Sequence, residues 1–265
     1  MVVVSYNRAQ RLRACLASIE NSNGRETLQS IVVDNGSMDG SAQLGDEFAA
    51  VRFFRLPKNF GLTKAMNIGW RAGEADYLLF LHDDAELEPE AVGVLADVLD
   101  ASPDVAAVCP LLIDEQGRPA PQLGKLPPDG EWRPAEVSGS DPVAVEYPRG
   151  AALMVRSFVL KSIRKIDERY GQFGSDADLA AQIRRGSRKI LLVPKARVRH
   201  YGDGKSTPLQ RADFLHGQAV YLGKHHGFGA GLRARIGSAL GALTSFRFAE
   251  LRYLMGGQKI DGNQH

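Results

Sequence analysis

The chain has 265 residues, of which 44% are apolar and 24% charged, with 33 Lys and Arg against 31 Asp and Glu. This composition is that of an ordinary globular protein and excludes the collagen-like, disordered and coiled-coil classes. The length accommodates one large domain, or one domain with an appendage. Cys15 and Cys109 are far apart and form no CxxC pair, which argues against a disulfide scaffold and a cysteine-built zinc site.

The first apolar run is too short for a signal peptide, and no apolar stretch reaches the length of a membrane span. We therefore expect a cytoplasmic protein. Charge is unevenly distributed: from residue 205 onward there are eight Lys or Arg and three acidic residues, which gives +5 there and −3 in the remainder. A basic tail predicts an anionic partner, although a solvated helical face would give the same pattern. We expect no nucleic acid among the partners.

The first hundred residues alternate between short apolar runs and segments with helical spacing. The apolar runs predict strands at residues 2–4, 31–33, 51–54 and 77–81. The spacing predicts helices near residues 12–19, 41–48, 62–71 and 89–101, with Pro89 at the first position of the last. Fully apolar strands that alternate with helices favour an α/β fold with a mostly parallel sheet.

Residues 105–112 form another predicted strand, after which the pattern changes. Seven prolines break residues 114–148 into a predicted loop, and loops of this length are often lids or binding segments. Regular structure resumes with a strand at 151–155, a helix at 176–185 and a strand at 190–193. Beyond residue 205 the spacing is purely helical.

Polar residues follow three of the predicted strands at the point where each strand ends. They are Ser5, Tyr6 and Asn7 after the first, Asp34 and Asn35 after the second, and His82, Asp83 and Asp84 after the fourth. Ligands of open parallel sheets bind at the carboxyl ends of the strands, so these clusters should lie at one edge of one sheet. Together they predict a nucleotide site.

The chain has no GxGxxG after the first strand and no P-loop, which argues against a dinucleotide oxidoreductase and a P-loop NTPase. Carboxylates at strand ends repel a diphosphate unless a divalent cation lies between them. Asp83 and Asp84 therefore predict Mg²⁺ or Mn²⁺ that bridges to phosphate. The alternative is an N-cap for the helix near Pro89, although Asp84 lies several residues too early for that.

Five segments follow one another along the chain and carry a resemblance. They are residues 5–8 (SYNR), 32–41 (VVDNGSMDGS), 59–69 (NFGLTKAMNIG), 81–87 (LHDDAEL) and 170–179 (YGQFGSDADL), followed by Arg184, Gly186, Pro194, Ala196 and His200. Their order and spacing resemble the family 2 glycosyltransferases, most of all a rhamnosyltransferase-like bacterial branch. The resemblance implies a GT-A-type three-layer sandwich around a mostly parallel sheet at 1–204, which leaves a basic amphipathic helical extension at 205–265.

The resemblance also implies roles for individual residues. Tyr6 would pack on the nucleotide base, with Asp34 or Asn35 at the edge of the base, Asp84 and His200 at the metal, and Asp176 as catalytic base. Further contacts to the donor would come from Ser5, Asn7, Asn59, Lys64 and Asp83. The donor would be a UDP-, dTDP- or GDP-sugar, and the acceptor a glycan or a lipid-linked molecule.

Three positions depart from the family pattern. His82 replaces the first Asp of the DxD motif, Asn35 replaces the second Asp of Asp-Asp-Gly-Ser, and Ser175 replaces the Glu before the base. None of the three removes Asp84 or Asp176, so we expect activity. One base without a protein nucleophile predicts a single displacement with inversion at the anomeric carbon.

Other interpretations stay open at this point. Asp176 could cap the helix at 176–185, and His200 could be a buried histidine with satisfied hydrogen bonds. The protein could be a sugar-phosphate nucleotidyltransferase, although residues 5–10 lack the glycine-rich basic loop that holds a triphosphate. It could also be a degenerate nucleotide- or glycan-binding module, which only Ser175 and His82 support.

The tail carries an apolar stripe at intervals of four, four, three and three residues, formed by Leu232, Ile236, Leu240, Leu243 and Phe246. Four arginines lie in the same segment, at 233, 235, 247 and 252. This composition is typical of an interfacial helix and predicts peripheral contact with the inner face of the plasma membrane. The alternative is that the stripe packs on the catalytic domain or on a second subunit of a homodimer.

Overall fold

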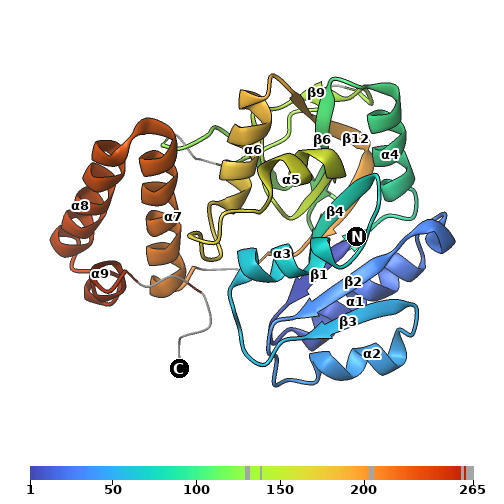
Figure 1. Cartoon of the computed structure of the whole chain (residues 1–265), viewed down its shortest axis with the longest axis horizontal. Coiled ribbons are helices and arrows are strands. Elements are labelled where there is room, and N and C mark those ends of the chain that lie inside the picture. Colours follow the sequence, from blue (N-terminus) through green and yellow to red (C-terminus); the bar gives the residue numbers. More distant parts are fainter. Residues whose placement is uncertain (129–131, 138, 203–205, 258–259, 261–265) are drawn as a thin grey trace.

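The computed structural model describes the chain except for residues 129–131, 138, 203–205, 258–259 and 261–265. The predicted boundary between residues 204 and 205 lies outside the described residues. Figure 1 shows a body built around a twisted sheet, with a separate group of helices beside it.

One large sheet forms the centre of the body, and its strands follow the order β3-β2-β1-β4-β11-β6-β12-β5, with β9 paired to β12. The strands are β1 (Val2–Ser5), β2 (Ser30–Asp34), β3 (Val51–Arg55), β4 (Tyr77–His82), β5 (Ala85–Leu87), β6 (Val105–Ile113), β9 (Val143–Ala144), β11 (Ala152–Arg156) and β12 (Lys189–His200). The pairs β1–β2, β2–β3, β1–β4 and β6–β12 are parallel. β11 is antiparallel to both of its neighbours, so the sheet is mixed.

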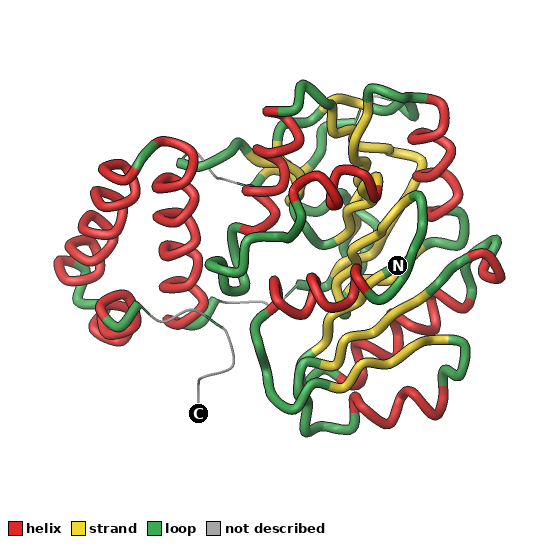
Figure 2. Tube along the Cα trace, in the orientation of Figure 1, coloured by secondary structure: helices red, strands yellow, loops and turns green. Residues whose placement is uncertain are grey.

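Helices cover both faces of the sheet, which confirms the predicted three-layer arrangement (Figure 2). One face packs against α1 (Ala9–Glu20), α2 (Leu44–Glu47) and α4 (Ala91–Ala101). The other packs against α3 (Leu62–Arg71), α5 (Ser157–Ile163) and α6 (Ser175–Arg185). Successive residues of a strand point to opposite faces, so Val2 and Val3 belong to different cores.

Several predicted elements differ from the structure. β12 spans 12 residues rather than the predicted four, and its register with β6 shifts between Val193 and Arg197, around Pro194. Pro194 has no backbone N–H to donate to a neighbouring strand, so the sequence predicts that the strand ends before it. In the structure β12 continues past Pro194 through an irregularity in its pairing with β6. The helix near Pro89 begins at Ala91 with Glu90 as its N-cap, so Pro89 lies before the helix.

The proline-rich segment is also more regular than the predicted loop. It contains a small antiparallel sheet in the order β10-β7-β8, made of β7 (Pro121–Gly124), β8 (Arg133–Pro134) and β10 (Tyr147–Pro148). These strands have two to four residues, too few to give a periodic pattern. The prediction also missed β5 and α5, for the same reason.

The C-terminal segment is helical, as predicted. It consists of α7 (Pro208–His226), α8 (Phe228–Thr244) and α9 (Phe248–Met255). α7 starts in a capping box, in which Thr207 and Gln210 bond each other's backbone, and Pro208 occupies its first turn. None of the helices in the described part of the chain combines the length and the hydrophobicity needed to cross a bilayer.

Candidate active site

The polar ends of three strands meet at one edge of the sheet, as predicted. β1 lies between β2 and β4, and its register places Ser5 beside Asp34 and Val4 beside His82. All three strands run in parallel, so their carboxyl ends share this edge. The residues that follow them are therefore brought together by the sheet itself.

Asp83 and Asp84 form the turn between β4 and β5. The Ser5 hydroxyl donates a hydrogen bond of 2.8 Å to Asp83. Arg8 Nη1 lies 3.4 Å from an oxygen of Asp83 and 3.2 Å from an oxygen of Asp84. The helix-cap alternative for this pair is wrong, because the N-cap of α4 is Glu90.

His82, Asp84 and His200 form a group that could hold a metal ion, because their ligand atoms all lie within 4.8 Å of one another. His200 ends β12 and pairs with Ala85 of β5, which places its Nε2 3.3 Å from Asp84 Oδ1. His82 Nδ1 lies 3.8 Å from the same oxygen. Within the described part of the chain this buried oxygen accepts no hydrogen bond, which fits an atom available to a cation.

The charge state of Asp84 also suits a metal ligand. Burial alone would raise the pKa of this carboxyl, but a hydrogen bond with His200 and electrostatic interactions with His82, His200 and Arg8 hold the pKa well below its ordinary value. Asp84 is therefore ionised across the physiological pH range. A buried anion of this kind needs a positive partner, and Arg8 supplies one in this structure.

Asp34, Asn35 and Asn59 organise two loops beside this edge. Asn35 donates to Asn59 at 2.9 Å and accepts from the backbone N–H of Phe60 at 2.8 Å, while Asp34 accepts from Ser37. Gly36 is required here: its φ is +83°, and an added Cβ would lie 2.5 Å from the backbone of the facing loop. The loops are therefore held in one arrangement by side chains that were predicted to contact the donor.

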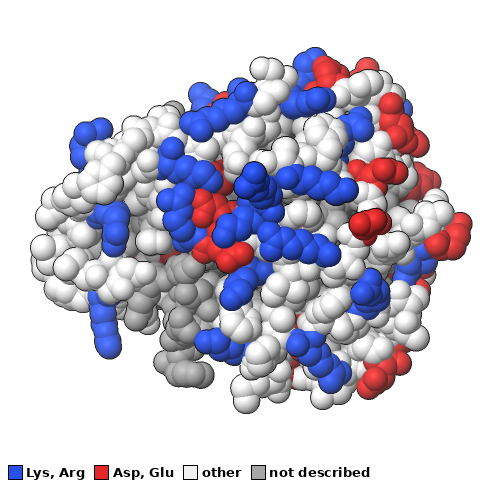
Figure 3. Space-filling model, in the orientation of Figure 1, with Lys and Arg blue, Asp and Glu red and all other residues white. Residues whose placement is uncertain are grey.

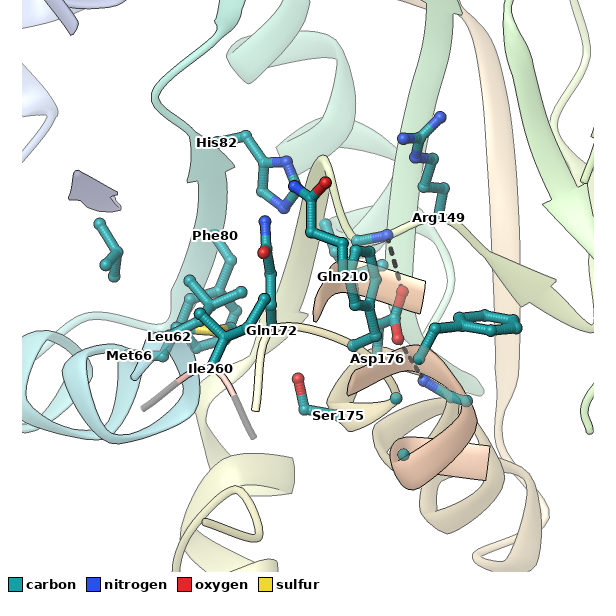
Figure 4. A pocket seen from close by; sticks show the side chains of 18 of the residues that line it. Leu62, Met66, Phe80, His82, Arg149, Gln172, Ser175, Asp176, Gln210 and Ile260 are labelled. Carbon is teal, nitrogen blue, oxygen red and sulfur yellow. Dashed lines mark hydrogen bonds between the residues drawn. The ribbon is translucent and has the colours of Figure 1, made fainter. Parts of the chain in front are cut away.

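A cavity of about 660 Å³ opens beside these loops, between the sheet edge, α6 and α7. Most of the predicted site residues line it: Ser5, Tyr6, Asn35, Asn59, Asp83, Asp84, Asp176 and His200. Figure 4 shows part of this space, with Gln210 between His82 and Asp176 in this view. Predicted metal and base residues thus share one cavity.

Three predicted residues do not line it. Asp34 is buried below its loop, and Lys64 is exposed with its ammonium 4.4 Å from the ring centroid of Phe60. Asn7 has a left-handed backbone, with φ of 53°, and its side chain accepts from the backbone of Met38. These three residues shape the neighbouring loops rather than the cavity wall.

Asp176 lies in the first turn of α6, whose N-cap is Gly174. Its carboxylate accepts from the backbone N–H of Gly150 at 3.3 Å and from the backbone N–H of Ala177 at 2.9 Å (Figure 4). Burial raises the pKa of Asp176, although these hydrogen bonds oppose the shift. Asp176 is not the N-cap residue, and it ties α6 to the segment before β11.

Several residues of the cavity wall were not predicted from the sequence. Tyr147 comes from the proline-rich segment and Arg149 directly follows it, while Gln210, Phe214 and Tyr221 come from α7. Arg8 had a detectable signal, since it directly follows the polar end of the first strand. No local pattern marks the α7 residues, because only the packing of α7 beside α6 brings them to the cavity.

The chain is similar in sequence to known glycosyltransferases. Residues 1–158 match the family model described as Glycosyl transferase family 2. An N-acetylglucosaminyltransferase of Mesorhizobium japonicum is 36% identical over 102 residues, which are 36% of this chain and 24% of that protein. The chain thus matches only about a quarter of this relative's length.

Solved structures share the fold. The mannosyltransferase PcManGT of Pyrobaculum calidifontis, in complex with GDP-Man and Mn²⁺, aligns over 97% of this chain and 84% of its own, with a TM-score of 0.65 and 16% identity. GalNAc-T7 with UDP, GalNAc and Mn²⁺ aligns over 82% of this chain and 47% of its own, with a TM-score of 0.66 and 17% identity. These likenesses confirm the predicted GT-A fold.

Proposed function

The chain belongs to glycosyl transferase family 2, and from that membership we propose that it transfers a sugar from a nucleotide-sugar donor to an acceptor hydroxyl. One observation supports this most: Asp84, with an imidazole on either side, lines the same cavity as the partly buried Asp176. A metal-binding carboxylate and a separate proton acceptor are the two groups that such a transfer needs.

The donor would bind at the edge where β1, β2 and β4 end. Tyr6 is 44% exposed and offers a ring face on which a base can stack. Arg8 lies beside the two aspartates, where its guanidinium can contact a diphosphate. Asn35 and Asn59 line the same region and can bond the edge of the base.

His82, Asp84 and His200 would hold the divalent cation. Its contribution when bound is to neutralise charge on the departing diphosphate. Two imidazoles and one carboxylate form a softer donor set than the all-oxygen set that Mg²⁺ prefers, so we propose Mn²⁺ rather than Mg²⁺. The departure from the family's DxD at His82 is then a change of ligand and does not weaken the site.

Asp176 would take the proton of the acceptor hydroxyl. A raised pKa makes a carboxylate a stronger base, and the hydrogen bonds from the backbone N–H groups of Gly150 and Ala177 orient it. The hydroxyl oxygen attacks the anomeric carbon as the sugar–phosphate bond breaks. With one base and no protein nucleophile in the scheme, the displacement inverts the anomeric configuration.

The identity of the sugar is a finer prediction. UDP, dTDP and GDP donors remain the predicted set, with a glycan or lipid-linked molecule as acceptor. The solved relatives named above bind UDP with GalNAc and GDP-Man, which supports a nucleotide-sugar donor without selecting one. Membership of the rhamnosyltransferase-like branch stays a prediction from the motif resemblance, and it does not name the transferred sugar.

A ligand screen tests the proposal. UDP-, dTDP- and GDP-sugars are added with Mn²⁺ or with EDTA, and the melting temperature is measured. A ligand at a hundredfold excess over its Kd adds about 2.7 kcal/mol of stability, which raises the melting temperature by roughly 5–10 °C for a chain of this size.

Turnover assays then separate the competing functions. Transfer or slow hydrolysis of the best donor supports a glycosyltransferase. Donor binding without any turnover would favour the degenerate binding module. Release of pyrophosphate from a nucleoside triphosphate and a sugar phosphate would favour the nucleotidyltransferase.

A further inference from the structure

The helix α8 exposes its large apolar side chains and buries its small residues. Leu232, Ile236, Leu240 and Leu243, which we call the α8 ridge, are 45%, 52%, 55% and 48% exposed. The buried residues of the helix are Gly231 and Ala242. A helix that serves only the protein's core buries its large side chains, so this arrangement is the reverse of the usual one.

The small residues bring α8 into backbone contact with α7. A Cβ added at Gly231 would lie 2.8 Å from the carbonyl oxygen of Ala219 and 2.8 Å from Cα of Gly223. At 3.6 residues per turn, the ridge falls on the side of α8 away from Gly231 and Ala242. The ridge is therefore only partly covered within the described chain, which argues against the alternative that the stripe packs on the catalytic domain.

In α7–α9 the acidic side chains are buried, whereas basic side chains are exposed on the surface. The acidic side chains of these helices are Asp213 and Glu250, and both are fully buried. Asp213 accepts backbone N–H groups of the segment before α6, while Glu250 pairs with Arg211 and Arg247. In the described part of these helices every exposed charge is therefore positive, including the exposed Arg233, Arg235 and Arg252.

The surface view agrees with this distribution. The lobe formed by α7–α9 at the left of Figure 3 is mostly white with separate blue groups, and red appears only toward the catalytic body. An apolar ridge flanked by cations matches two chemical features of an anionic bilayer surface: acyl chains below and negative headgroups above.

We propose that the α8 ridge and its neighbouring arginines seat the protein on an anionic lipid leaflet. A second copy of the chain fits this surface less well, because two apposed faces would bring arginine against arginine with no exposed acidic residue to pair them. Each basic residue near such a leaflet strengthens binding about fivefold. This inference stands on α8 and does not depend on the proposed sugar transfer.

Flotation with lipid vesicles tests the proposal on the full chain. The probes are vesicles of phosphatidylcholine alone and of phosphatidylcholine mixed with phosphatidylglycerol. We expect binding to the mixed vesicles that weakens as salt is added, and little binding to the neutral ones.

Two variants separate the apolar and charged contributions. Ile236→Asp, in the centre of the ridge, should lower vesicle affinity about tenfold or more. The charge reversal of Arg233→Glu with Arg235→Glu should remove most of the salt-sensitive binding. Val143→Asp is the matched control, since Val143 is 50% exposed but lies on the catalytic body, and it should bind like the wild type.

Folding and oligomeric state are followed in the same samples by circular dichroism and sedimentation. Equal binding of wild type and Ile236→Asp, both folded, would overturn the proposal. So would wild-type protein that stays with the buffer at low salt. A concentration-dependent dimer that Ile236→Asp dissociates, without vesicle binding, would assign the ridge to a second copy instead.

Discussion

Asp84 and Asp176 line one cavity, yet their surroundings move their pKa values in opposite directions. Contact with His200 and nearby positive charge keep the pKa of Asp84 low against the effect of burial, whereas burial keeps that of Asp176 raised. A carboxylate that is always ionised, such as Asp84, is suited to binding a cation. A carboxylate that accepts a proton more readily, such as Asp176, is suited to act as a general base. This contrast gives each residue its own expected phenotype.

Replacing Asp176 by Asn should reduce kcat by roughly 10²–10⁴-fold, because the amide cannot accept the hydroxyl proton. Donor affinity, measured by titration calorimetry, should stay close to that of the wild type. Asp97→Asn, which changes an exposed carboxylate on α4, is the control and should leave kcat unchanged. Retention of more than about a tenth of wild-type turnover would instead favour a purely structural role.

The metal group makes a separate prediction. Asp84→Asn should weaken Mn²⁺ binding by tenfold or more, as followed by the spin-resonance signal of free Mn²⁺ in the presence of UDP. His82→Asp should narrow the preference for Mn²⁺ over Mg²⁺, because it replaces a nitrogen ligand by oxygen. His226→Asn alters an exposed imidazole of α7 and serves as control. Unchanged Mn²⁺ affinity in Asp84→Asn would contradict the ligand assignment.

At the scale of elements, a buried ionic cluster joins α6 to α7. Asp178 of α6 lies 2.8 Å from Lys224 Nζ and 2.6 Å from His225 Nε2, and Lys224 also reaches Asp167 at 3.0 Å. Burial alone would raise the pKa of Asp167, but hydrogen bonds from Arg169 and Lys224 hold it below its ordinary value of 3.8. The cluster fixes α7 against the helix that carries Asp176.

This cluster predicts a pH dependence of stability. Because the pKa of Asp167 is lower in the folded than in the unfolded chain, its contribution is fully present above about pH 4 and disappears as the pH falls below 3.8. Lys224→Met should reduce the free energy of unfolding by about 1–3 kcal/mol at neutral pH. It should also flatten the acid limb of the curve, measured by urea unfolding. An acid limb of unchanged slope would contradict the coupling.

The sequence predicted most elements where hydrophobic periodicity was long enough to read. Strands such as β4, and the meeting of three strand ends, follow from apolar runs alone. Short elements such as β5 and α5 gave no periodic signal, and Pro194 hid the second half of β12. From the sequence alone His82 is only a departure from a motif, because its proximity to His200 exists only after β12 pairs with β5.

At the scale of the molecule, the cavity is lined both by the edge of the sheet and by α7, the first of the C-terminal helices. Gly217 of α7 lies against Phe173, where an added Cβ would be 2.5 Å from the carbonyl oxygen. The sequence alone predicts an appendage after residue 205, because contacts of this kind leave no mark on local composition. We therefore propose that residues 1–204 and 205–265 are not functionally separate. α7 belongs to the C-terminal helices and also forms part of the cavity wall.

Ligand binding should consequently stabilise helices far along the chain. Addition of UDP with Mn²⁺ is expected to slow hydrogen exchange of the α7 amides, because α7 forms one wall of the cavity. The amides of α4, on the opposite face of the sheet, are the internal control and should exchange at unchanged rates. Saturating ligand that protects neither α7 nor α6 would place the binding site elsewhere.

His82 and Asp84 lie far from His200 along the sequence, and this distance has a consequence for the synthesis of the protein. A nascent chain that has emerged through residue 158 already contains the first strands and the Asp83–Asp84 turn, but it lacks one imidazole of the group. Only the synthesis and insertion of β12 supply it. The complete group could therefore bind a cation only late in synthesis, after β12, the last strand of the sheet along the chain, has paired with its neighbours.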